Sequence, residues 1–110
     1  MIRPPLSDAA AGLLRALLNR AGVSRNRILL TEFSSVDWHS LTFAGEQHHI
    51  VFRIPGPDPG SVVTRLTDGL ADAEFAIPGQ IVADIALIGT PHVAADGSMS
   101  VEIEALTIAE

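Results

Sequence analysis

The sequence predicts an α+β domain in which two helices cover one face of a five-stranded, mostly antiparallel sheet, in the order α-β-β-β-α-β-β. Two segments repeat apolar residues every three or four positions, which is the spacing of an amphipathic helix. Several others alternate apolar and polar residues, as half-buried strands do. With 110 residues, 47% of them hydrophobic, the chain fits a single two-layer sandwich spanning residues 1–110.

Both expected helices have recognisable ends. Ser7 is a typical N-cap for a helix over 8–21, and Gly22 is a typical residue just beyond its last turn. A second helix is expected over 59–73, because proline is well tolerated at the first helical position, here Pro59.

The first three expected strands form a meander at the centre of the sheet. They cover 27–33, 40–44 and the residues after Glu46 as far as Ile54, with Gly45-Glu46 as a two-residue type II′ turn. This turn fixes the pairing, so that one face becomes the core side. That face would carry His39, Leu41, Phe43, His48, Ile50 and Phe52, and the opposite face Trp38, Ser40, Thr42, His49, Val51 and Arg53.

Two further strands are expected over 80–88 and 98–108, joined by a hairpin at Asp96-Gly97. Pro91 then has to lie at a sheet edge or in a bulge, because proline donates no ladder hydrogen bond. The apolar residues of the last strand change parity between Ile103 and Leu106. A bulge near Ala105 is the simplest interpretation of that change.

Composition limits the function classes. The net charge is −6, with six arginines against four acids in 1–53 and one arginine against nine acids in 54–110. Such an acidic chain is a poor nucleic-acid binder. No apolar run approaches the ~20 residues of a membrane helix. There are no cysteines, and no secretory signal is apparent, so a cytoplasmic protein is expected.

The sequence offers no persuasive catalytic, metal or cofactor site. His48 and His49 are adjacent on a strand, so they face opposite sides and cannot chelate one ion. Glu102 and Glu104 share a face, but alternating glutamates usually keep that face solvated. We therefore expect no catalytic residues, no metal and no cofactor. Asp84, in an apolar strand, should be exposed or hydrogen-bonded to an arginine or a backbone N–H.

The best binding candidates are Trp38, His49 and Arg53 on the outer face of the meander. Tryptophan and arginine are over-represented at binding hot spots, and the predicted pairing of Trp38 with Arg53 would allow a cation–π contact. Alternatively, Trp38 folds over the strand end as a lid on the core.

Two functions follow. The first is a non-catalytic domain that self-associates or binds a protein through its open sheet face or edge. The alternative is a small enzyme or small-molecule binder with a pocket between sheet and helices, using His39, His48 or Asp84.

We expect a homodimer, because two helices cover only one sheet face and would leave apolar side chains in water. The side chains concerned are Leu29, Phe33, Val51 and Val82. Alternatively, residues 34–40 and 89–97 fold across the open face and cap it.

Overall fold

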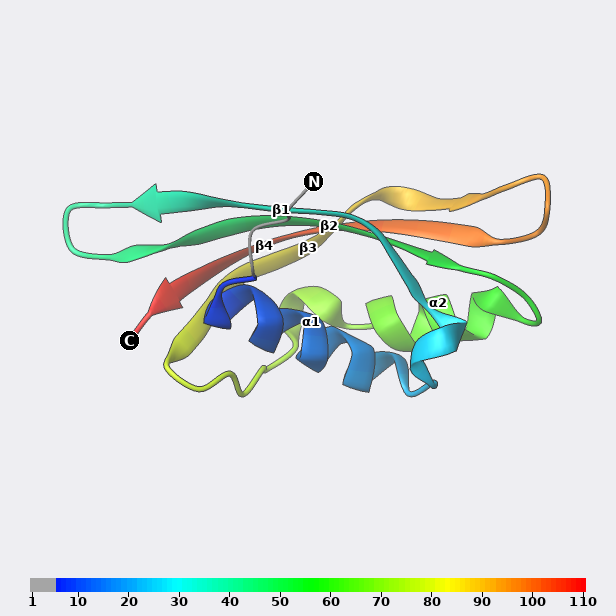
Figure 1. Cartoon of the computed structure of the whole chain (residues 1–110), viewed down its shortest axis with the longest axis horizontal. Coiled ribbons are helices and arrows are strands. Elements are labelled where there is room, and N and C mark those ends of the chain that lie inside the picture. The colour runs from blue at the N-terminus through cyan, green and yellow to red at the C-terminus, as the bar shows by residue number, and fades with distance from the viewer. Residues whose placement is uncertain (1–5) are drawn as a thin grey trace.

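The computed structural model describes residues 6–110, in which two helices lie under a four-stranded antiparallel sheet (Figure 1). The elements are α1 (Asp8–Ala21), β1 (Leu29–His39), β2 (Ala44–Ile54), α2 (Pro59–Thr67), β3 (Gln80–Val93) and β4 (Met99–Ala109), with short 3₁₀ turns η1 (Arg25–Arg27) and η2 (Leu70–Asp72). The strand order is β1-β2-β4-β3. The α+β class and the two helices on one face are confirmed.

The prediction of five strands is wrong, and the element order is α-β-β-α-β-β. β1 continues through residues 34–39, which we expected to lie between two strands, and it ends at His39. Residues 40–43 are the loop of the β1–β2 hairpin, where the Ser40 hydroxyl accepts a hydrogen bond from the Phe43 N–H. Leu41 at the loop tip is 105% exposed. Leu41 and Phe43 are therefore loop residues, although their spacing resembles that of a strand. The Ser40 hydroxyl stabilises the loop by accepting a backbone hydrogen bond that a strand would make with its neighbour.

Gly45 lies inside β2 and not in a turn. It pairs with Trp38 on one side and with Ile108 on the other. A Cβ atom at Gly45 would lie 1.9 Å from the carbonyl oxygen of Thr107, well inside van der Waals contact. The glycine is present because β2 and β4 approach closely here, and the predicted type II′ turn is wrong.

The helix ends agree in part with the sequence. The Ser7 side chain caps α1 by accepting a hydrogen bond from the Ala10 N–H, and Gly22 adopts the left-handed conformation that ends the helix. The second helix is shorter than predicted: α2 ends at Thr67, and Gly69 at φ +65° introduces η2.

The core lies between the helices and the inner sheet face. On β2 the inward residues are His48, Ile50, Phe52 and Ile54, and on β4 they are Val101, Ile103, Ala105 and Thr107. The helices contribute Leu13, Leu17, Val62 and Leu66 to the same cluster. β2 and β4, which supply most of these sheet residues, are the central strands, and β1 and β3 are the edge strands.

The predicted bulge near Ala105 is wrong, because β4 keeps one parity throughout. Its register with β2 is regular from Met99 to Ile108. The register shifts lie in β3 instead, between Val82 and Asp84 and between Ile88 and His92. Pro91 falls within the second shift on an edge strand, which confirms its expected position. Leu106 and Ile108 consequently point away from the core.

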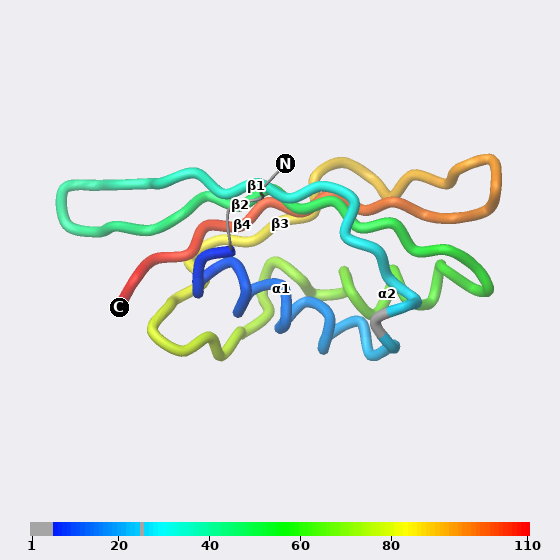
Figure 2. Tube along the Cα trace, in the orientation of Figure 1, coloured from blue at the N-terminus to red at the C-terminus, as the bar shows by residue number. Residues whose placement is uncertain are grey.

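Both hairpins extend the sheet past the helices (Figures 1 and 2). Residues 34–39 belong to β1, and 89–93 belong to β3. Neither segment folds across the face opposite the helices, so the alternative in which loops cap this face is wrong. None of the helices within residues 6–110 is long and apolar enough to cross a bilayer.

Candidate interaction surface

His48 forms a fully buried polar contact on the inner face. Its Nδ1 lies 2.6 Å from Ser35 Oγ and its Nε2 lies 2.8 Å from Thr107 Oγ1, so both ring nitrogens have partners. Burial lowers the pKa of His48, although the Glu46 carboxylate opposes this shift. The neutral ring, enclosed by two hydroxyls and without solvent access, joins three strands and is a structural group.

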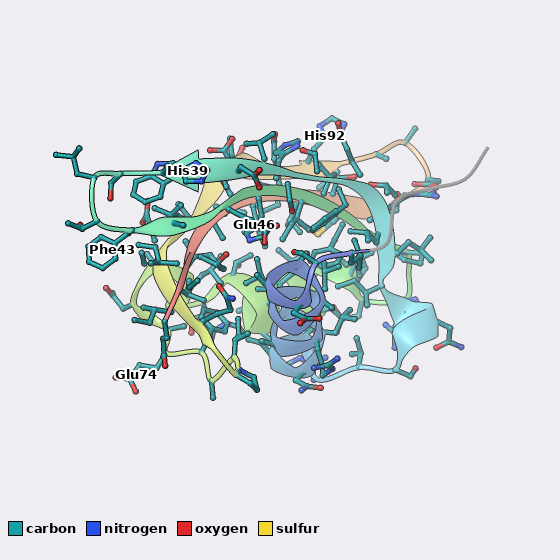
Figure 3. The ribbon with its side chains drawn as sticks, turned by 60° about the vertical axis from the view of Figure 1, so that its left-hand side comes forward. His39, Phe43, Glu46, Glu74 and His92 are labelled. Atoms are coloured by element: carbon teal, nitrogen blue, oxygen red, sulfur yellow. The ribbon has the colours of Figure 1, made fainter. Side chains whose placement is uncertain are left out.

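Glu46 lies between the sheet and α1 (Figure 3), where it accepts a hydrogen bond of 2.8 Å from the Ser7 hydroxyl. Ser7 is also the N-cap of α1. This bond fixes the start of α1 beneath β2 and brings the helix N-terminus close to the inner sheet face.

The structure does not bring together His39, His48 and Asp84, the residues named for the alternative pocket between sheet and helices. His48 is buried, whereas His39 is exposed at the β1–β2 hairpin tip, near Phe43 (Figure 3). Asp84 is exposed on β3, which confirms the expectation for its carboxylate. In the described part of the chain, no group of three or more histidine, aspartate or glutamate side chains could hold a metal ion.

Two shallow grooves run along α1, and neither is lined by His39, His48 or Asp84. One, of about 420 Å³, lies between Asn19 and Phe75. The other, of about 390 Å³, is mainly apolar and is lined by Leu14 and Leu18 of α1 together with Leu30 of β1. Neither brings together a nucleophile, a base and an oxyanion donor.

The three predicted binding residues share the outer face but lie far apart along it. Trp38 pairs with Gly45, His49 with Ser34, and Arg53 with Leu29. The predicted pairing of Trp38 with Arg53 is therefore wrong, because it relied on the incorrect turn. Since the core is on the other face, Trp38 is not a lid on the core either.

Arg53 is held at the β3–β4 hairpin. Its Nε donates to Ser98 Oγ at 3.1 Å, and its guanidinium forms an ion pair with Asp96. Two hydrogen bonds from Ser98 and this guanidinium lower the pKa of Asp96 to about 2. The cation thus orders a hairpin turn.

His49 bonds to Glu102 across the β2–β4 pair, with 2.5 Å between Nε2 and the carboxylate. This hydrogen bond raises the pKa of His49, with a smaller effect of the neighbouring glutamates. The centre of the outer face is acidic, since Glu32, Glu102 and Glu104 surround this histidine.

Comparison with protein-family models and with curated proteins finds no match to this chain.

An apolar patch lies at the other end of the outer face. Cross-strand pairing places Trp38 and Ile108 on either side of Gly45, with Ile81 next to Ile108, and the following row contains Val36 and Leu106. Val36 and Ile81 are exposed, and the other three side chains are half-buried. We call these five side chains the outer apolar patch.

Of this patch, the sequence reasoning identified only Trp38 as a site residue. The sequence did contain a signal for the rest of the patch. The apolar residues of β4 change from odd to even positions, and this change, which we interpreted as a bulge, reflects apolar side chains on both faces of the strand. Of the four side chains expected in solvent, Leu29 is exposed and Val51 half-buried on the outer face. Phe33 and Val82 instead pack against the core cluster.

Proposed function

We propose that this chain is a non-catalytic domain that self-associates as a homodimer through the β1 side of its open sheet. The outer apolar patch supports the proposal, since it gathers five large apolar side chains at one end of a face that no helix of residues 6–110 covers, and two of them, Val36 and Trp38, lie on the edge strand β1. Contiguous apolar surface of this kind is typical of protein–protein interaction sites.

The position of the patch favours a contact through β1. Val36 and Trp38 are on the edge strand, and Val36 is 61% exposed. A partner that reaches this edge covers the most exposed part of the patch without crossing the acidic centre of the face. A second copy of the chain supplies a matching edge with the same two side chains, as a two-fold interface requires.

Light scattering during size-exclusion chromatography tests this proposal. We expect a mass of twice the 11.6 kDa of one chain, falling on dilution because the contact is small. Val36→Lys should give a monomer, since lysine on an edge strand opposes pairing. Val93→Lys is the matched control, because Val93 has the same 61% exposure on the other hairpin. A wild-type mass of one chain at every concentration would reject the homodimer.

A further inference from the structure

The two edges of the sheet differ in how well they are protected. β3 contains Pro91 and two register shifts, devices that block strand addition. β1 is regular from Glu32 to His39 and contains no proline, lysine or arginine. In the described residues β1 pairs only with β2. Its other edge is therefore a template for a further strand.

The hairpin turn shows which backbone groups β1 presents at this edge. The Ser40 N–H donates to the Phe43 carbonyl, so this pair is hydrogen-bonded. Hydrogen-bonded pairs alternate along an antiparallel ladder, and the register is constant from His39 back to Glu32. The even-numbered residues therefore bond to β2. The N–H and C=O groups of Phe33, Ser35, Asp37 and His39 point outward.

Packing of two outer faces against each other is electrostatically unfavourable. Glu32, Glu104 and Asp84 lie on this face, and no described side chain forms an ion pair with any of them. Desolvating an unpaired carboxylate is unfavourable, because the charge loses its hydration and gains no partner. Strand addition at β1 leaves all three carboxylates in water, so it is the less costly contact.

We propose that β1 of one protomer pairs in antiparallel orientation with β1 of a second copy, with the two-fold axis at Val36. This inference rests on the proposed homodimer and specifies its interface. The four-stranded sheets of the two protomers then form one continuous sheet, with both helical layers on the same side. Val36 faces its own copy, Ser35 faces Asp37, and Phe33 faces His39.

The charges on β1 and the regular part of its ladder favour a two-fold axis at Val36 over an axis at a neighbouring residue. The two-fold axis is normal to the sheet, so a residue can face only residues of the same parity. An axis at Asp37 would place two carboxylates opposite each other, which is destabilising. An axis at Ser35 would place Trp38 opposite Glu32 and bring in Thr31, which lies in the register shift of β1. With the axis at Val36, the outward groups of 33–39 are all paired.

Single cysteines test this interface cleanly, because the chain has none of its own. Val36 and its copy form a non-hydrogen-bonded pair, with Cα atoms about 4.5 Å apart, which is within disulfide range. Under mild oxidation Val36→Cys should give disulfide-linked dimers. Ser34→Cys should stay unlinked, because Ser34 and its copy are four residues apart along the strands, about 14 Å.

Leu106→Cys distinguishes the edge contact from a face contact. Leu106 is on β4, with β2 between it and the β1 edge, so it should not cross-link in the edge-paired dimer. Rapid cross-linking of Leu106→Cys, or none of Val36→Cys in a protein with twice the monomer mass, would overturn the edge interface and leave the homodimer standing. A wild-type protein that is monomeric throughout would reject both.

Discussion

Replacing Gly45 by alanine is expected to destabilise the fold by about 3 kcal/mol or more, because the added methyl group has no space. It would lie 1.9 Å from the Thr107 carbonyl oxygen, and this neighbour is backbone that cannot rotate away. The two central strands would have to separate where they support Trp38 and Ile108. Chemical denaturation with urea measures the effect as a shift in the midpoint.

Gly60→Ala is the matched control for this substitution. A Cβ atom at Gly60, in the first turn of α2, meets nothing within 4 Å, and alanine favours helix by about 1 kcal/mol over glycine. We expect Gly60→Ala to be neutral or slightly stabilising. Equal urea midpoints for the two variants would disprove the close approach of β2 and β4.

Replacing His48 by alanine should cost about 3–5 kcal/mol, which is the loss typical of removing a large buried side chain. Ser35 also loses its side-chain partner, as does the buried Thr107 hydroxyl, and an unsatisfied buried hydroxyl adds to the cost. Thermal unfolding followed by circular dichroism should show a decrease in Tm of more than about 10 °C. His92→Ala, at an exposed position on β3, should change Tm little.

The pH dependence of stability separates the effect of the imidazole from that of lost packing. The pKa of His48 in the folded protein lies below its ordinary value of 6.5, so the unfolded chain binds the proton more readily. The free energy of unfolding should therefore fall as the pH drops below 6.5. His48→Phe, which restores most of the volume, should lack this decline. An unchanged pH profile in His48→Phe would assign the decline to other groups.

The sequence predicted the α1 boundaries, the core face of β2 after His48 and the β3–β4 hairpin, because each has a strong local signal. Ser7 and Gly22 bracket a helical stripe, Ile50, Phe52 and Ile54 alternate, and Asp96-Gly97 is a turn pair. It failed where local signals disagreed with distant contacts. Gly45 resembles a turn glycine, but glycine is required there because a carbonyl group of β4 leaves no space for a side chain. No local sequence pattern reveals this contact.

That one error affected the candidate site. Placing the turn at Gly45 paired residues 38–44 with residues 47–53, and so brought Trp38 opposite Arg53. The structure instead places Trp38 near Leu106 and Ile108 of β4. The sheet order, which places Trp38 in one row with a residue 70 positions later, is not visible as periodicity. The apolar outer positions of β4 were visible, but a bulge explained them equally well.

Hydrogen exchange at the backbone amides of β1 tests edge pairing most directly. In a monomer, the N–H groups of Phe33, Ser35, Asp37 and His39 face solvent and exchange quickly, while those of Ser34, Val36 and Trp38 are protected by β2. Strand addition protects the first set and leaves the second unchanged.

The measurement is made at high and low protein concentration on the wild-type chain. We expect slow exchange of the four outward amides at high concentration and fast exchange on dilution, with the β3 edge amides unaffected. Fast exchange of these four amides at a concentration where the mass is twice 11.6 kDa would contradict pairing through β1.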